Sequence, residues 1–294
     1  VTGYDADATD PENDGLTYSI IGTGADDDDF NIDSVSGVLS FKVAPDADIV
    51  GDANGNNIYE VAIRVSDGTS NDDQTVFVTV NDINEAPVMT SGGSISVIEN
   101  NLTTGYVATS TDVDGDTPSY SIAGTGDDDA DFGIDSVSGA LSFLVAPDFE
   151  TPSSLANSNV YEVDILVSDG GLTDTQTVLV TVTNENEDPT LGASGTTNVE
   201  ENLLATGFTA SATDPDAGAT QVYALAADTP TNDNSLFQID GGSGVLSFLA
   251  APDFETPGSY LASNTYTVDV EVTDTLGGSD AETYFIAVTD VVEP

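Results

Sequence analysis

The sequence contains no cysteine, histidine or tryptophan, and its 294 residues include two basic side chains, Lys42 and Arg64. Without cysteine no disulfide can stabilise the chain, and that count leaves the redox compartment open. Without histidine or cysteine, any metal site must use oxygen ligands, which suits Ca2+ or Mg2+ and argues against zinc, copper or haem. A Lys–Asn cross-link is impossible beyond Lys42. Core packing and bound metal remain as the means of stabilisation.

Positive charge is almost absent, because 53 acidic residues face two basic ones and the formal net charge is -51. Such a surface repels phosphate backbones and anionic lipid, which argues against nucleic-acid and membrane-surface partners, and it attracts cations. No apolar run reaches the roughly 20 residues of a membrane span, so we expect no membrane insertion in this segment. With 38% hydrophobic residues, the composition is not that of a disordered acidic chain.

One sequence pattern occurs three times, beginning near Thr2, Thr104 and Thr206 and leading to FNIDSVSGVLSF, FGIDSVSGALSF and FQIDGGSGVLSF. Equivalent positions are 102 residues apart, then 102 or 105, as in Gly3, Gly105 and Gly207 and in Asp33, Asp135 and Asp240. A period of this length is a whole domain. We therefore expect three repeats, residues 1–87, 88–189 and 190–294. The chain begins inside a repeat, without a signal-peptide pattern, so we expect it to belong to a longer protein.

Short strands account for most of the pattern within each repeat. Alternation predicts core positions at Tyr161, Val163, Ile165 and Val167, and at Val178, Val180 and Val182. Two short strands surround a tight turn whose glycine needs a positive φ, at Gly37, Gly139 and Gly244. No segment has a helical period. About seven strands in roughly 100 residues indicate an all-β fold of immunoglobulin-like sandwiches.

Short acidic segments ending in proline separate the repeats, at residues 81–87 and 184–189, and a similar segment ends the chain. They are too short and too stiff to act as flexible tethers. The loops at the facing ends of two neighbouring repeats must therefore lie close together. Those loops carry the repeated acidic residues.

Several ordered motifs together resemble tandem cadherin-type repeats of bacterial kind: IEN at residues 98–100, TDVDGD, TDPDAG, APDFE, VSDG and DINEAP. The resemblance covers almost the whole chain. It implies three seven-stranded β-sandwiches in an elongated array, with the first repeat lacking its N-terminal strand. In that family, a base glutamate, an Asp-x-Glu segment and the linker meet an Asp-x-Asp segment and a later aspartate of the next repeat, and together they enclose Ca2+.

The resemblance implies a ligand set for each junction. At the second junction the ligands are Glu99, Asp148, Glu150, Asn184, Asn186, Glu187, Asp214, Asp216 and Asp274. At the first junction they are Asp46, Asp48, Asp82, Asn84, Glu85, Asp112, Asp114 and Asp169. Half-sites facing further repeats consist of Asp10, Glu12 and Asp67 at one end and of Glu201, Asp253, Glu255, Asp290 and Glu293 at the other.

The two junctions differ in three ways. The first lacks the base glutamate, and its Asp48 stands where the family has glutamate, so a bidentate contact can be lost there. In the second, Asn184 replaces an aspartate and removes one charge. Ca2+ accepts six to eight oxygens in irregular geometry, whereas Mg2+ demands a tight octahedron. We expect a junction that is loose without metal and stiff with it.

Simpler structural roles compete with the metal hypothesis. A single Asp-x-Asp-Gly is usually only a turn, but three phased copies with ordered partners favour a site. The runs Asp26–Asp29 and Asp127–Asp129 are interpreted as solvated acidic surface outside the ligand set. Five tyrosines on strands are predicted to be core or half-buried side chains rather than sugar-stacking platforms: Tyr18, Tyr59, Tyr120, Tyr161 and Tyr266.

Three classes of function follow. The leading hypothesis is a Ca2+-rigidified stalk or filament segment of an extracellular, secreted surface protein that attaches cells to cells or to surfaces. Its partners would be Ca2+, neighbouring repeats, other copies of the chain or surface glycans. The alternative is a carbohydrate-binding accessory module of a secreted polysaccharide-active protein, which a concave aromatic patch would favour. No motif singles out a pair of catalytic acids, so we expect no enzyme.

Overall fold

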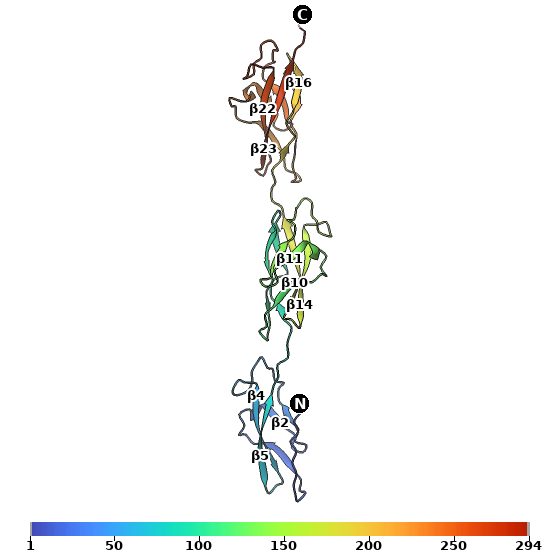
Figure 1. The fold of residues 1–294 in the computed structure, drawn as a ribbon, viewed down its shortest axis with the longest axis vertical. Helices are drawn as coiled ribbons and strands as arrows, with labels where there is room; N and C mark the ends of the chain where they lie inside the picture. Colours follow the sequence, from blue (N-terminus) through green and yellow to red (C-terminus); the bar gives the residue numbers. More distant parts are fainter. Residues whose placement is uncertain (1, 293–294) are drawn as a thin grey trace.

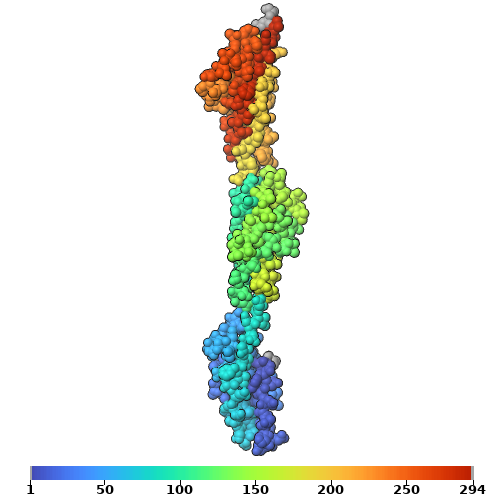
Figure 2. All heavy atoms as spheres, viewed as in Figure 1, coloured from blue at the N-terminus to red at the C-terminus, as the bar shows by residue number. Residues whose placement is uncertain are grey.

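Three β-sandwiches follow one another end to end in the computed structural model, which describes residues 2–292 (Figure 1). The chain runs from the blue repeat through the green repeat to the red one, and a narrow linker joins each pair. The space-filling view shows the same elongated shape, with a waist at each linker (Figure 2). This confirms the predicted all-β, elongated array of three sandwiches.

The second repeat shows the complete arrangement. One sheet has the order β10-β13-β14-β7, the other has the order β11-β12-β8, and β6 and β9 form a separate ribbon. Strand β7 pairs parallel with β14, and the other pairs are antiparallel. The elements are β6 (Val88–Met89), β7 (Ser94–Ile98), β8 (Thr103–Val107), β9 (Ser110–Thr111), β10 (Ser119–Ile122), η2 (Asp129–Asp131), β11 (Phe132–Ile134), β12 (Ala140–Phe143), β13 (Val160–Ser168) and β14 (Thr173–Thr183).

The third repeat has the same topology, with sheets β16-β23-β22-β19 and β17-β21-β20 and the ribbon β15-β18. Its elements are β15 (Thr190–Leu191), β16 (Thr196–Glu200), β17 (Ala205–Thr209), β18 (Ala212–Thr213), β19 (Val222–Leu225), η3 (Asn234–Leu236), β20 (Phe237–Ile239), β21 (Val245–Phe248), β22 (Thr265–Thr273) and β23 (Ser279–Thr289).

The first repeat has a three-stranded sheet, β1-β4-β5, because among residues 2–292 no strand pairs with the outer edge of β5. The segment before β1 lies alongside β3, since Thr2 N donates to Leu39 O and Leu39 N donates to Tyr4 O. The elements are β1 (Thr17–Ile20), η1 (Asp27–Asp29), β2 (Phe30–Ile32), β3 (Leu39–Phe41), β4 (Ile58–Ser66) and β5 (Asn71–Thr79).

Each repeat encloses its own hydrophobic core. The alternating residues of β13 and β14 predicted for the core are at most 1% exposed, and the five strand tyrosines are at most 9% exposed, which confirms both predictions. Two phenylalanines and a tyrosine form the centre of each core. In the second repeat, the rings of Phe143 and Tyr161 meet edge to face with centroids 5.2 Å apart, a favoured aromatic geometry.

The predicted tight turn lies between β11 and β12, and it recurs in the other repeats. Its glycines have φ of 71° at Gly37, 70° at Gly139 and 71° at Gly244. A side chain at Gly139 would also meet the carbonyl oxygen of Ala108. Glycine is required at this turn because its backbone is left-handed and the backbone of Ala108, just after β8, lies against it.

The interpretation of the two aspartate runs as solvated surface is wrong for four residues. Asp26, Asp27, Asp128 and Asp129 are buried, although Asp28 and Asp127 in the same runs are exposed. Their carboxylates accept backbone N–H groups from distant segments, which repays the cost of burial.

In the second repeat, Asp128 accepts N–H groups of Leu155 and Glu162, and Asp129 accepts those of Asp164 and Gly126. The buried aspartates therefore tie this loop to β13.

Within residues 2–292 there is no helix with the length and apolar character of a membrane span.

Candidate metal centres at the repeat junctions

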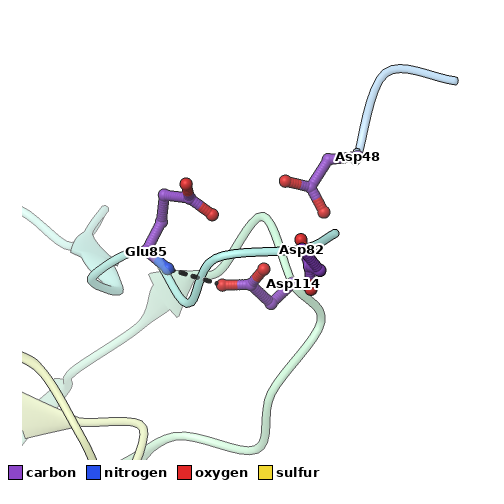
Figure 3. Close-up of side chains that lie close together, drawn as sticks. All are labelled: Asp48, Asp82, Glu85 and Asp114. Atoms are coloured by element: carbon purple, nitrogen blue, oxygen red, sulfur yellow. Dashed lines mark hydrogen bonds between the residues drawn. The ribbon is translucent and has the colours of Figure 1, made fainter. Parts of the chain in front are cut away.

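Four carboxylates from three segments meet at the first junction (Figure 3). Asp48 comes from the loop after β3, Asp82 and Glu85 come from the linker, and Asp114 comes from the loop after β9. Each offers an oxygen, and these oxygens all lie within 4.8 Å of one another. The first repeat, the linker and the second repeat thus share one acidic cluster.

Hydrogen bonds hold the linker of the first junction against the second repeat. Glu85 N donates to Asp114 Oδ2 at 2.8 Å, the bond drawn in Figure 3, and Asn84 Nδ2 donates to Asp169 Oδ2 at 2.9 Å. Asp112 Oδ1 accepts Asp114 N at 3.0 Å. The linker is therefore docked on the second repeat by amide donors, which leaves carboxylate oxygens facing the cluster.

The remaining predicted residue of the first junction, Asp46, lies two positions before Asp48 and caps its own loop. Its Oδ1 accepts Asp48 N at 3.0 Å, and it is absent from the group of four converging carboxylates. Asp46 therefore shapes the turn that presents Asp48.

The second junction is built around a buried glutamate. Glu99 directly follows β7 and is 2% exposed. Its two oxygens accept Phe149 N and Glu185 N, each at 2.8 Å, so it joins the loop after β12 to the linker. Oxygens of Glu99, Glu150 and Glu187 lie within 4.8 Å of one another.

The linker of the second junction contacts the third repeat as the first linker contacts the second repeat. Asn186 Nδ2 donates to Asp274 Oδ2 at 2.9 Å, and Glu187 N donates to Asp216 Oδ2 at 2.8 Å. Asn184 Nδ2 donates to the other oxygen of Asp216 at 2.7 Å. The amide that replaces an aspartate at position 184 therefore supplies a docking bond of its own.

Two further predicted residues shape loops of the second junction. Asp214 Oδ1 accepts Asp216 N at 3.0 Å, and Asp148 Oδ1 accepts Thr151 N at 2.8 Å. The bond of Asp214 matches that of Asp112 at the first junction, and Asp46 likewise accepts the N–H three residues on, from Ile49 at 3.4 Å. The two junctions thus share much of their construction, and they differ in the bonds made by Glu99 and Asn184.

Burial, repulsion between carboxylates and hydrogen bonds shift the pKa of acids at both junctions. Burial and then the neighbouring Glu99 raise the pKa of Glu150 and of Glu187, and burial and then Asp82 raise the pKa of Asp48. The pKa of Asp169 is lowered, first by the backbone N–H of Gly171, and that of Asp274 is lowered, first by the Asn186 amide. The raised values belong to carboxylates that converge on one another, whereas the lowered ones belong to carboxylates that accept hydrogen bonds.

Unpartnered oxygens test whether these residues suit a metal ion. At the first junction, Asp112 Oδ2 and Asp114 Oδ1 are buried and accept no hydrogen bond. At the second junction the same holds for Asn186 Oδ1, Glu187 Oε2 and Asp214 Oδ2. A buried oxygen without a donor costs free energy, and a mixed set of carboxylate and amide oxygens is the donor type that Ca2+ takes. The residues present therefore fit a Ca2+ site.

The predicted half-site at the end of the third repeat is brought together only in part. Glu201 is 3% exposed and accepts Phe254 N and Val291 N at 2.9 Å each, and it clusters with Asp253 and Glu255. Asp290 lies in the exposed segment after β23, outside that cluster, and Glu293 lies outside the described residues.

At the opposite end of the array, Asp10 and Asp67 line one shallow hollow beside the β4–β5 turn, and Glu12 is not among its lining residues. Both carboxylates bind their own loops, since Asp10 accepts Asp14 N and Asp67 accepts Thr69 N. Asp67 lies in the β4–β5 hairpin turn, which is equivalent to the β13–β14 turn that places Asp169 at the first junction.

Several asparagines at these sites were not predicted from the sequence. Asn100 Nδ2 donates to Glu187 Oε1 at 3.0 Å and so bridges the base glutamate segment and the linker. Asn57, Asn159 and Asn264 each donate to a carbonyl oxygen inside a ligand loop. Their spacing of 102 and 105 residues, the same as that of Asp33, Asp135 and Asp240, was the signal that could have found them.

Relatives of the chain point to one repeat type. No protein-family model matches the chain. It is 32% identical over 271 residues to protocadherin Fat 4 of Mus musculus, across 86% of this chain, and 28% identical over 313 residues to protocadherin Fat 1 of Homo sapiens, across 99%. The solved structure of mouse cadherin-23 EC22-24 covers 97% of this chain and 89% of its own, with 20% identity and a TM-score of 0.59. The chain is built of cadherin repeats.

Two of the acidic clusters lie between cadherin repeats, where Ca2+ sites are expected, and that of Glu201, Asp253 and Glu255 lies at the end of the third repeat. Cadherin repeats are a non-enzymatic family, which agrees with the expectation that this segment is not an enzyme. The chain spans 5% of the length of the Fat 4 relative and 6% of the Fat 1 relative. The similarity therefore covers a small part of each relative.

Proposed function

We propose that this segment is a Ca2+-rigidified stalk of an extracellular adhesion protein, held at the cell surface and mediating attachment to cells or surfaces. The observation that carries the proposal is the convergence of carboxylates from two repeats and their linker, with buried oxygens left without donors. The similarity to protocadherins supports the extracellular, adhesive setting.

The residues that would hold the ions are the converging acids Asp48, Asp82, Glu85 and Asp114 at the first junction and Glu99, Glu150 and Glu187 at the second. The oxygens of Asp112, Asn186 and Asp214 that lack donors complete the proposed ligand sets. Bound Ca2+ would supply positive charge and bonds to oxygens of both repeats. In its absence, repulsion among the acids opposes docking, so the rigid array depends on the ion.

The finer features of the proposal depend on the sequence motifs. A filament role and a bacterial kind of repeat follow from the motif resemblance, while the curated relatives come from mouse, fly and human. A carbohydrate-binding module gains no support from the strand tyrosines, because they are buried in the cores.

Small-angle scattering with CaCl2 and with a chelator tests the proposal, together with calorimetric titration of Ca2+. We expect heat of binding and a longer, narrower distribution of interatomic distances with Ca2+. A matched variant, Glu187→Gln, removes one converging charge, and the exposed Asp127→Asn serves as its control. No heat of binding and an unchanged maximum dimension would refute the stalk proposal.

A further inference from the structure

Three asparagines make the same pair of contacts in the three repeats. The side-chain Nδ2 of Asn57 donates to Ala47 O at 2.7 Å, that of Asn159 to Phe149 O at 2.9 Å and that of Asn264 to Phe254 O at 3.0 Å. Each acceptor is the central residue of an Asp-x-Asp or Asp-x-Glu loop, between Asp46 and Asp48, between Asp148 and Glu150, or between Asp253 and Glu255.

The backbone of the same asparagines binds the strand that leads into the next linker. Asn57 O accepts Val80 N at 2.9 Å, Asn159 O accepts Val182 N at 2.8 Å, and Asn264 O accepts Val288 N at 2.7 Å. Each valine lies two residues before a predicted ligand position, at Asp82, Asn184 and Asp290. One residue thus joins the two segments of its repeat that carry the proposed ligands.

Each of these asparagine side chains donates from Nδ2, while its oxygen has no partner. Oδ1 of Asn57, of Asn159 and of Asn264 is buried without a donor, in all three repeats. An unpartnered buried oxygen is unfavourable, so an apolar residue of similar size would fill the same space at a lower cost in free energy. What an apolar residue could not supply is the hydrogen bond that Nδ2 donates to the ligand loop.

We propose that Asn57, Asn159 and Asn264 are positioning residues, each of which sets the Ca2+ affinity of the acidic site to which its own Asp-x-Asp or Asp-x-Glu loop belongs. This site is the first junction for Asn57 and the second junction for Asn159. The inference rests on the proposed function, since it concerns the same sites. In the second repeat the backbone of Phe149 is held from both sides, by Glu99 at its N–H and by Asn159 at its carbonyl. This clamp fixes the direction in which Asp148 and Glu150 leave the loop. Outer residues that orient metal ligands commonly change metal affinity by about tenfold or more.

The test is a residue-resolved NMR titration of the whole segment with CaCl2, following the amides of Glu85 and Glu187 as reporters of the two junctions. Asn159→Ala is expected to weaken Ca2+ binding at the second junction about tenfold and to leave the first within about twofold. Asn57→Ala is expected to do the reverse. This crossed pattern is local, whereas general destabilisation of the fold would not select one junction.

Thr104→Val is the matched control, because Thr104 Oγ1 is buried and donates to Leu141 O at 2.7 Å in the same repeat, without contact to a ligand loop. It should lower the melting temperature in chelator and leave both affinities unchanged. In chelator, Asn159→Ala should also speed hydrogen exchange at Thr151, whose N–H binds Asp148.

Unchanged affinity at the second junction in Asn159→Ala, with a melting temperature lowered as in Thr104→Val, would overturn the inference and leave the asparagine purely structural. If Asn159→Ala does not fold, Asn57→Ala decides by the same criteria at the first junction. A wild-type chain whose amides do not respond to CaCl2 refutes the proposed function itself, and thereby also the role in binding.

Discussion

Individual carboxylates in this chain have opposite roles that their residue type does not distinguish. The carboxylate of Asp128 is buried and accepts two backbone N–H groups, which offset the cost of its desolvation, whereas Glu187 has one buried oxygen without a donor. The first kind completes a hydrogen-bond network, and the second kind leaves an open ligand. Burial together with an unpartnered oxygen therefore separates candidate metal ligands from structural acids.

Replacing Asp128 by alanine should destabilise the second repeat. The backbone N–H groups of Leu155 and Glu162 would lose charged acceptors at 2.6 Å and 2.8 Å. Hydrogen bonds to charged groups contribute about 1.5 to 3 kcal/mol each, so we expect a loss of about 3 kcal/mol or more. Calorimetric unfolding in chelator measures it. Asp127→Ala, at the exposed neighbour, should change little, and equal effects of the two variants would contradict the assignment.

The pH dependence of the second junction follows from the raised pKa of Glu150 and Glu187. An acid whose pKa is raised on docking binds protons more tightly when docked, so the metal-free junction gains stability as pH falls through that raised pKa and loses it as pH rises. With Ca2+ present the sign is opposite, because protons compete for the same oxygens.

We therefore expect Ca2+ affinity at the second junction to fall as the pH is lowered from neutral through the raised pKa of Glu150 and Glu187, while docking in chelator becomes more favourable over the same range. Calorimetric titration and scattering at several pH values measure the two trends. Glu150→Gln should weaken both of them. Affinity that is independent of pH would show that these acids are not ligands.

At the scale of the element, the strands and turns position the ligand loops. The β11–β12 turn is left-handed at Gly139, and the loop after β12 carries Asp148 and Glu150. The β13–β14 hairpin turn places Asp169 against the preceding linker, and the end of β14 leads into the following one. Each repeat thus offers acids at both of its ends, because antiparallel strands bring their turns to opposite ends of the sandwich.

Gly139→Ala should destabilise the second repeat more than Gly105→Ala does. Both glycines have positive φ, 70° and 74°, so both variants incur backbone strain of about 1 kcal/mol or more. Only at Gly139 would the added carbon meet backbone atoms of another segment, at Ala108 just after β8, whereas nothing lies within 4 Å at Gly105. Thermal unfolding in chelator compares the two variants. Equal losses would mean that the close approach to Ala108 relaxes freely.

At the scale of the whole molecule, the net charge of -51 acts on a narrow, elongated array. Each repeat has its own core, and the described cores do not merge across the linkers. Contact between neighbours is therefore polar, made by linker amides and carboxylates. Repulsion between the ends of adjacent repeats opposes the docked arrangement unless cations offset it.

Added NaCl should partly replace Ca2+ in stabilising the metal-free chain. Raising the concentration from about 0.05 M to about 0.5 M shortens the screening length to a few Å and weakens repulsion among exposed acids. We expect a higher melting temperature in chelator and a smaller gain when Ca2+ is present. Differential scanning calorimetry measures both, with KCl as the matched salt. A melting temperature that does not respond to either salt would contradict the repulsion argument.

The amino-acid sequence by itself determined the repeat, the strand alternation and the glycine turns, because these depend on residue type and local spacing. Tyr161 and Gly139 could be predicted for that reason. The acidic motifs could likewise be related to the junctions, since they recur in phase with the repeat.

Only the tertiary structure decided what each carboxylate does. Asp128 binds N–H groups 27 and 34 residues away, and Asn159 joins the loop at Phe149 to strand β14 at Val182, two segments that meet only after folding. Local sequence does not encode which oxygens such long-range donors occupy. The oxygens of Asp112, Glu187 and Asp214 that remain without a donor are defined by folding, and they carry the case for a metal ion.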